Sequence, residues 1–215
     1  MEDNKKIAET LKMMNKAAVK ALTQEEFDKA QDIFERSLAI EERLNLKVPS
    51  AESLVNIANI LCIKGEINEA IAKLNQAMDI FKQEKENLKA FKTAQSIGSI
   101  YFQHENYAQA AQMYEKCIIM HIGGKDSATA YFQAACAYMK LGSNFRAQDY
   151  LGRAISEFEK IDDKAGIIVC MKKRAELHSS TGRKDLAVMD LRKGIKFAGD
   201  NEKITEELNK MMAAI

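Results

Sequence analysis

Small and apolar positions recur along the chain with a fixed period. Five alanines lie in near-identical surroundings at intervals of 40, 40, 37 and 40 residues: Ala30, Ala70, Ala110, Ala147 and Ala187. A small residue lies twelve positions before each of them: Ala18, Ala58, Gly98, Ala135 and Ala175. An apolar or aromatic residue lies four positions after: Phe34, Leu74, Tyr114, Leu151 and Leu191. A sustained repeat of this length is typical of a solenoid, in which one structural unit is stacked several times.

The spacing predicts two antiparallel helices in each unit. Small residues twelve apart across a turn allow two helices to approach closely, while larger residues fill the groove between them. Gly65, Gly142 and Gly182 mark such turns, because glycine readily takes the left-handed conformation that ends a helix. We expect five helical hairpins, over about residues 5–46, 49–86, 88–122, 126–161 and 163–198. A last helix over about 201–214 carries apolar residues at helical spacing and is predicted to cap the stack.

Three local motifs bear on where the helices begin and end. Residues 23–26, of sequence TQEE, are interpreted as a capping box that opens the second helix of the first unit. Asp162 and Asp163 lie where a helix start favours an acidic cap, which is a simpler interpretation than a catalytic carboxylate pair. Residues 123–125, of sequence GGK, lack the spacing of a phosphate-binding loop. They are expected to close the third unit early, in agreement with the interval of 37 residues.

Within each unit, small and aromatic residues follow one order. The third unit shows it best, with Gly98, Tyr101, Tyr107, Ala110, Tyr114 and Cys117; the second and fourth follow, and the first and fifth match less well. This order resembles the tetratricopeptide repeat (TPR) family. The resemblance implies an all-α fold, a right-handed superhelical solenoid of five TPR-like hairpins plus a C-terminal capping helix, as a single domain over residues 1–215. The period is longer than the family's usual one. The family's usual proline after the second helix is also missing, since the only proline is Pro49. Longer second helices would explain both differences.

Composition bounds the class of protein. The 215 residues are 47% hydrophobic, lack tryptophan and carry a formal net charge of +1. No apolar run is long enough to span a membrane, and the first residues lack the basic-then-apolar order of a secretion signal. A cytoplasmic protein without membrane insertion is therefore expected. The four cysteines form no CxxC pair, so we predict reduced thiols, no metal and no cofactor.

Catalytic residues are not evident in the sequence. His104, His121 and His178 are the only histidines, and His178 takes the position of the aromatic residue in the fifth unit. Packing between helices is its expected role. We predict a protein without enzymatic activity.

The resemblance also implies a binding site. In TPR proteins the first helix of each unit lines a concave groove. The corresponding positions of this chain carry amides, lysines and one serine: Asn15, Lys16, Asn56, Asn59, Lys92, Gln95, Ser99, Gln133, Lys172 and Lys173. A carboxamide offers donors and an acceptor, so it can bind the backbone of an extended peptide without reading its sequence. The alternative is that these side chains are simply solvated. The carboxylate clamp of chaperone-binding members is matched only at Asn56 and Lys92, which disfavours a chaperone tail as ligand.

Charge is concentrated near the C-terminus. Residues 164–196 contain nine basic side chains and three acidic ones, a difference of +6. An acidic partner and a solvated face are both compatible with this segment. Nucleic acid is not expected, because no aromatic residues interleave with the charges for base stacking.

The predicted function is that of an adaptor which binds a peptide or helix of a partner protein in its concave groove. The expected oligomeric state is a monomer or weak homodimer. The alternative is a structural subunit that self-associates or stacks in a larger assembly. A regulator that encloses its target enzyme is less favoured, because the sequence predicts no second domain.

Overall fold

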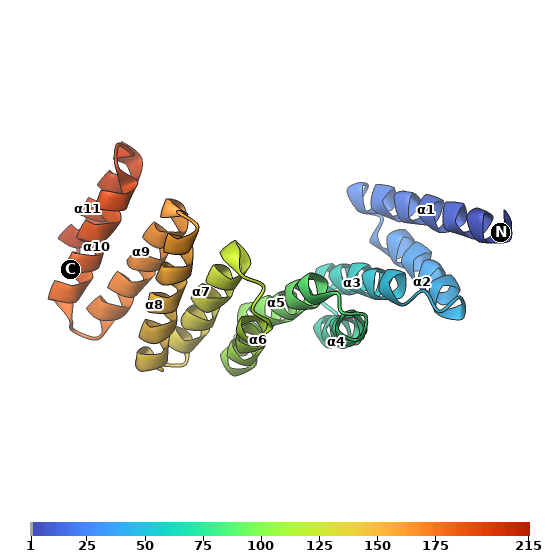
Figure 1. Ribbon diagram of the computed structural model, residues 1–215, viewed down its shortest axis with the longest axis horizontal. Coiled ribbons are helices and arrows are strands. Elements are labelled where there is room, and N and C mark those ends of the chain that lie inside the picture. The colour runs from blue at the N-terminus through green and yellow to red at the C-terminus, as the bar shows by residue number, and fades with distance from the viewer. Residues whose placement is uncertain (1) are drawn as a thin grey trace. The chain divides into compact units, whose positions relative to one another are not determined.

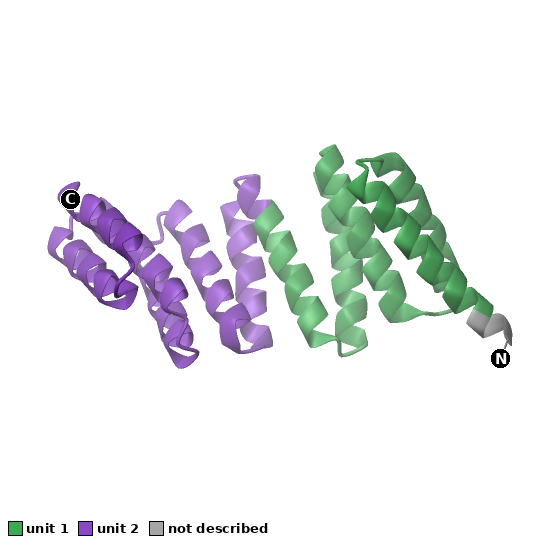
Figure 2. Ribbon diagram, turned by 90° about the horizontal axis from the view of Figure 1, so that it is seen from above, with its two compact units in different colours: residues 1–100 green, residues 101–215 purple. Residues whose placement is uncertain are grey.

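The computed structural model describes the backbone of residues 2–215 and the side chains from residue 6 onward. Over this range the chain forms eleven α-helices and no strand (Figure 1). The chain divides into two compact units, residues 1–100 and 101–215 (Figure 2). The all-α prediction is confirmed. The prediction of one domain over the whole chain stays a prediction, and the two units are described separately below.

The first unit contains four complete helices and most of a fifth. These are α1 (Glu2–Thr23), α2 (Phe27–Arg43), α3 (Lys47–Lys64), α4 (Ile67–Gln83) and the first part of α5 (Asn87–Gln103). Contacts join α1 to α2, α2 to α3 and α3 to α4. Lys89 of α5 forms an ion pair with Glu52 of α3 at 2.5 Å and lies 5.8 Å from the ring centroid of Phe81 in α4. Consecutive helices of this unit therefore pack against one another.

The second unit holds the remaining six helices. These are α6 (Tyr107–Met120), α7 (Gly124–Lys140), α8 (Asn144–Lys160), α9 (Lys164–Ser180), α10 (Lys184–Ala198) and α11 (Glu202–Ala213). Each helix packs against the next one along the chain. Leu208 of α11 is fully buried against α9 and α10, in a cluster that includes Ala175, Ala187 and Leu191. The last helix thus covers apolar residues of the helix pair before it.

The repeated positions of the sequence form the core of both units. All five central alanines, Ala30, Ala70, Ala110, Ala147 and Ala187, are 0% exposed. The larger residues four positions later are also buried, between 0% and 3% exposed: Phe34, Leu74, Tyr114, Leu151 and Leu191. The prediction of repeated helical hairpins is confirmed, because the same register places small residues at close contacts and large ones in the interior throughout.

Overpacking one of these contacts is expected to destabilise the fold. Ala110→Leu inserts three carbon atoms at a position with no free surface. We expect it to lower the free energy of unfolding by about 1–3 kcal/mol, measured by urea denaturation. Gln112→Leu, on an exposed position of the same helix, is the control and should change stability little. Equal stability of Ala110→Leu and the wild type would contradict the close packing described here.

The turns share one backbone conformation whether or not glycine is present. Gly65, Gly142 and Gly182 have φ values of +81°, +70° and +75°, as the sequence predicts. Glu25 and Glu105 take the same left-handed conformation at the corresponding turns, with φ of +59° and +61°. The stack therefore requires this turn even where the residue has to accept some strain, because a side chain disfavours left-handed backbone.

Of the three expectations about helix ends, the early close of the third unit is confirmed, the acidic cap is confirmed for Asp163 alone, and the capping box is wrong. Asp162 lies in the turn, with a φ of +51°. Asp163 caps α9, because its Oδ1 accepts a hydrogen bond from the Gly166 N–H at 2.9 Å. The turn before α7 begins early, and α6 has only 14 residues. The capping box at residues 23–26 does not form: α2 has no side-chain cap, and the Thr23 hydroxyl instead donates to the Lys20 carbonyl at 2.7 Å. Thr23 ends α1, so its hydroxyl is satisfied inside that helix.

Candidate functional site

A cleft in the first unit is bounded by α1, α2 and α3. Its volume is about 690 Å³. Half of its fourteen lining residues are apolar, and polar residues from all three helices are interspersed: Ile7, Ala8, Leu11, Lys12, Asn15, Phe34, Ser37, Glu41, Leu44, Leu46, Pro49, Glu52, Ser53 and Asn56. A partly apolar concavity with a few convergent polar groups is the usual form of a binding site.

The cleft exists because α1 packs closely only along its C-terminal half. Ala18 and Ala21 are 0% and 2% exposed, so this half of α1 lies directly against its neighbours. Ile7 and Leu11, on the same helix face at helical spacing, are only half-buried. Apolar side chains therefore remain partly accessible along one wall of the cleft.

A buried carboxylate lies among the lining residues. Glu41 is 6% exposed, although it is an acidic residue in the last turns of α2. The Ser37 hydroxyl donates to Glu41 Oε1 at 3.0 Å, and the Ser53 hydroxyl of α3 donates to Oε2 at 2.8 Å. A carboxylate that is removed from water needs such donors, because burying an unpaired charge is costly.

The second unit has a smaller hollow at the corresponding repeat positions. Its volume is about 290 Å³, and its lining includes Thr129, Phe132, Phe158, Gly166 and Val169. Counted from the central alanines, these positions correspond to Lys12, Asn15, Glu41, Pro49 and Glu52 of the first unit's cleft. The repeat thus produces a hollow at the same place in each unit. Its chemistry is mixed in the first unit and largely aromatic and aliphatic in the second.

The predicted groove residues are divided between the two units. Seven of the ten belong to the first and three to the second. Asn15 of α1 and Asn56 of α3 line the same cleft. Lys16, Asn59 and Lys92 are exposed on α1, α3 and α5, and Gln95 and Ser99 are half-buried on α5. The structure therefore brings Asn15 and Asn56 to one concavity, and the other five do not line this cleft.

In the second unit the predicted lysines already have carboxylate partners. Lys172 of α9 is paired with Glu207 of α11. Lys173 is paired with Glu176 of the same helix at 2.6 Å. Gln133 is half-buried on α7. The two lysines are thus less available to an acidic ligand than the sequence suggests, because a ligand would have to compete with these intramolecular pairs.

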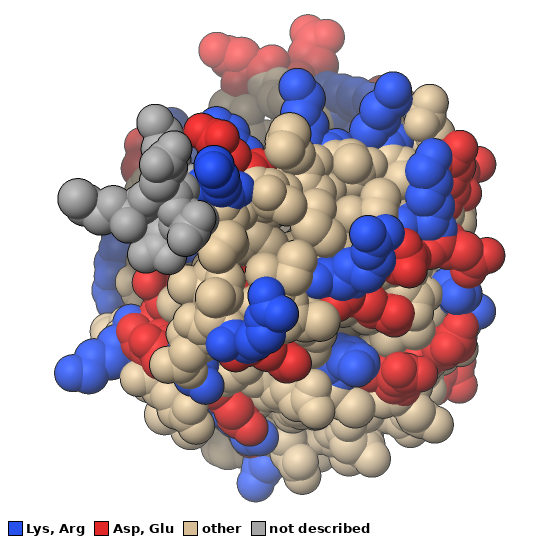
Figure 3. Space-filling model, turned by 90° about the vertical axis from the view of Figure 1, so that its right-hand side faces the viewer, with Lys and Arg blue, Asp and Glu red and all other residues tan. Residues whose placement is uncertain are grey.

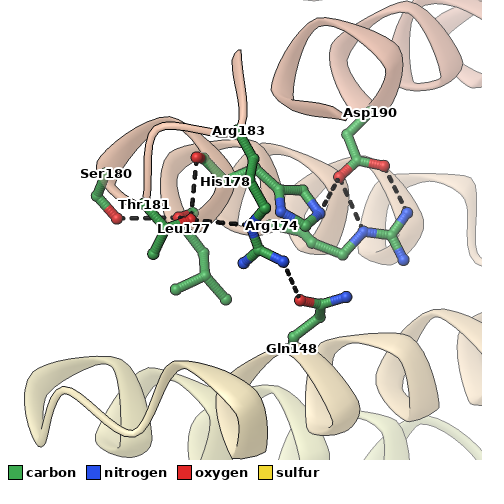
Figure 4. A network of polar contacts seen from close by, with 8 residues as sticks. All are labelled: Gln148, Arg174, Leu177, His178, Ser180, Thr181, Arg183 and Asp190. Atoms are coloured by element: carbon green, nitrogen blue, oxygen red, sulfur yellow. Dashed lines mark hydrogen bonds and ion pairs between the residues drawn. The ribbon is translucent and has the colours of Figure 1, made fainter. Parts of the chain in front are cut away.

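Other basic residues of the segment 164–196 are also engaged within the unit (Figure 4). The Arg174 guanidinium donates from Nε to Asp190 Oδ2 at 2.9 Å and from Nη2 to Oδ1 at 2.6 Å. Arg183 donates from Nη1 to the Gln148 side-chain oxygen at 2.9 Å, which links α10's start to α8. Arg192, Lys193 and Lys196 are exposed on α10 beside a hollow of about 480 Å³. These three, together with the exposed Lys164 of α9, are basic side chains that an acidic partner could reach.

His178 lies within this network and packs as the sequence predicts. Its side chain is buried, with Nε2 3.6 Å from Asp190 Oδ2, and Nδ1 has no hydrogen-bond partner. Burial lowers the pKa of His178 below its ordinary value of 6.5, and Arg183 and Arg174 lower it further, while Asp190 opposes the shift. The neutral imidazole is therefore the favoured form in the fold.

Stability is expected to fall below about pH 6.5 because of His178. Below this pH the His178 imidazole binds a proton more readily in the unfolded chain than in the folded one, because its pKa is lower in the fold. The free energy of unfolding is therefore highest above the pKa of the unfolded state, and it declines as the pH drops toward the pKa of the folded state. Urea denaturation at pH 7 and pH 5 of the wild type and of His178→Phe measures this contribution. The variant should lose less stability on acidification. Identical losses in the two proteins would contradict a depressed pKa.

The four cysteines are poorly suited to act as nucleophiles. Cys62, Cys117, Cys136 and Cys170 form no disulfide bond, and burial raises the pKa of Cys117 and Cys170 to about 12 and that of Cys136 to about 11. A thiol with a raised pKa is a poor nucleophile. Within the part of the chain that the structure describes, no group of three histidine, cysteine or acidic residues gathers that could hold a metal ion.

Charges of both signs are interspersed at the end of the molecule where α1 and α2 lie (Figure 3). Uncharged surface separates them, and no single sign dominates this view. This end of the molecule therefore presents no broad field of one sign in this view.

The sequence matches the tetratricopeptide repeat family over residues 49–119 and again over residues 128–160. The chain belongs to this family. Repeats of this kind indicate a protein–protein interaction or scaffold role, and their fold is generally non-catalytic. Among curated proteins, none matches the sequence.

Solved structures of repeat proteins are similar in fold. The apo form of RapI aligns with a TM-score of 0.80 at 14% identity, over 96% of this chain and 61% of RapI. BtubC from P. vanneervenii aligns with a TM-score of 0.76 at 14% identity, over 94% of this chain and 85% of that one. MamA aligns with a TM-score of 0.70 at 19% identity, over 91% and 96%. At these identities the similarity concerns the fold alone. None of the described helices is both long and apolar enough to cross a membrane.

Proposed function

We propose that the protein is a non-catalytic adaptor that binds a peptide or helix of a partner protein through the inner face formed by the first helix of each pair. The observation that carries this proposal is the cleft of about 690 Å³ in the first unit. Three helices of two successive pairs contribute to it, and two of the predicted amides, Asn15 and Asn56, lie in its lining.

The chemistry of the cleft suits a peptide better than a small polar metabolite. Half-buried Ile7 and Leu11 offer apolar surface, from which water is released when a ligand side chain covers it. Asn15 and Asn56 offer carboxamides that can donate to a peptide carbonyl and accept from a peptide N–H. Apolar contact then supplies affinity, while the amides fix the direction of the chain.

Selection from a displayed library of random 12-residue peptides, with the full chain as bait, tests this proposal. Peptides that bind the wild type should bind Asn15→Ala/Asn56→Ala more weakly, because each lost hydrogen bond is worth about 0.5–1.5 kcal/mol. Gln76→Ala removes an exposed amide from α4, a second helix of its pair, and is the matched control. Calorimetry should find its affinity unchanged. If the selected peptides bind Asn15→Ala/Asn56→Ala as tightly as they bind the wild type and the control, the peptide-binding site lies outside this cleft.

A structural subunit is the second candidate, and one observation favours it. Met13 and Val19 of α1 are 65% and 49% exposed, so α1 presents apolar side chains to solvent. Such side chains could pack against another copy of the chain or against a neighbouring subunit. Sedimentation equilibrium of the wild type and of Met13→Lys/Val19→Lys distinguishes the candidates. An oligomer that is stable in the wild type and dissociates in the variant would favour the structural role.

A further inference from the structure

The floor of the first unit's cleft departs from the repeat pattern. Glu41 lies eleven residues after the central alanine of its pair, where the second and fourth pairs have Phe81 and Phe158. These two phenylalanines are 2% and 6% exposed, and Glu41 is 6% exposed. A carboxylate has therefore replaced an aromatic ring without leaving the interior. An ion is much harder to bury than a ring, so the repeat architecture alone does not account for it.

The residues around Glu41 depart from the pattern together with it. Ser37 corresponds to Ala77 and Ala154 of the second and fourth pairs, and Ser53 corresponds to Thr93 and Cys170. Both serines are buried, and each uses its single hydroxyl proton to bond one oxygen of Glu41. A carboxylate has room for about four hydrogen bonds. The site thus holds the carboxylate in place and leaves part of its accepting capacity unused.

Among the residues whose side chains the structure describes, no cation neutralises this carboxylate. None of the ion pairs among the described residues includes Glu41. The other charged residues that line the cleft are Lys12, which is exposed on α1, and Glu52, which is paired with Lys89 at 2.5 Å. The cleft therefore combines apolar walls with a fixed negative charge at its floor.

We propose that Glu41 receives a lysine or arginine side chain of the bound peptide, flanked by apolar residues that contact Ile7, Leu11 and Leu46. This inference rests on the proposed function and names the ligand chemistry of its site. A cationic donor supplies the charge and the hydrogen-bond protons that the serines do not. The methylene groups of such a side chain also suit the apolar walls, because long basic side chains bury their stems readily.

A pair of small probes tests the cation site directly. n-Butylguanidinium carries the cationic group of arginine, and n-butylurea is its neutral counterpart of nearly the same shape. Each is titrated into the full-length protein, and the methyl NMR signals of Ile7, Leu11 and Leu46 are followed. We expect saturable shifts with the guanidinium and much weaker ones with the urea. Glu41→Gln should weaken guanidinium binding roughly 10- to 100-fold, since it removes a charged hydrogen-bond acceptor.

Two further measurements separate a binding role from a purely structural one. Glu41→Phe installs the residue of the corresponding pairs, and it should abolish guanidinium binding while melting no lower than the wild type. Gln76→Ala should bind the guanidinium as the wild type does. Equal binding of the two probes, or guanidinium binding that Glu41→Gln leaves unchanged, would overturn the inference. The inference would also be overturned if both Glu41 variants melted at a lower temperature than the wild type and neither probe shifted the wild-type signals.

The peptide selection distinguishes failure of this inference from failure of the proposed function. Wild-type protein should enrich peptides with a basic residue between apolar ones, and Glu41→Gln should lose that preference. Peptides that depend on Asn15 and Asn56 but show no basic preference would leave the proposed function intact and overturn the role of Glu41. A chain that binds guanidinium through Glu41 but selects no peptide would overturn the proposed function, and with it the peptide as the source of the cation.

Discussion

Asp190→Ala is expected to lower the free energy of unfolding of the second unit by about 3–5 kcal/mol. The Asp190 side chain is 1% exposed and accepts two hydrogen bonds from Arg174, whose side chain is 20% exposed. Removing the carboxylate leaves a largely buried guanidinium without its counter-ion, beside the neutral His178. Urea denaturation measures the loss. Faster hydrogen exchange in α9 and α10 should locate it.

The control for this prediction removes both charges together. Arg174→Met/Asp190→Leu replaces the pair by apolar side chains of similar volume, and it should recover most of the lost stability. A single Asp190→Ala variant that loses under about 1 kcal/mol would mean that Arg174 finds water or another partner, and that the pair is not buried as described.

Phe91→Ala is expected to cost a similar amount, about 3–5 kcal/mol. Phe91 of α5 is 0% exposed, so truncation removes its buried surface and leaves a cavity in a close-packed interior. The matched control is Phe145→Ala, because Phe145 of α8 is 88% exposed and its truncation should change stability by no more than about 0.5 kcal/mol. Equal shifts of the melting temperature in the two variants would contradict this assignment of interior and surface.

The interior could be predicted from the sequence because it repeats. Ala30 and Ala187 have the same neighbours at the same distances along the chain, and both are fully buried. The turn glycines were predictable for the same reason, since a left-handed conformation is a local requirement. The capping box at residues 23–26 shows the limit of local reasoning. Thr23 is the last residue of α1, and its hydroxyl donates to the Lys20 carbonyl of that helix instead of capping α2.

The candidate site was predictable only in part. Asn15 and Asn56 were found from their positions in the first helices, and both line the cleft. Glu41 was missed, although its replacement of Phe81 and Phe158 is visible in the aligned repeats. The predicted groove positions all lie on first helices, whereas the cleft also receives residues from the C-terminal end of α2.

The sequence by itself determined the family, the helical pairs and the residues of their interior, because a repeat unit buries the same positions each time and short-range spacing specifies them. Only the tertiary structure decided which polar side chains remain available to a ligand. Lys172 and Glu207 are 35 residues apart and nevertheless pair, and Ser53 reaches Glu41 from the next helix. Such contacts depend on how neighbouring helices pack, so the period of the repeat does not encode them.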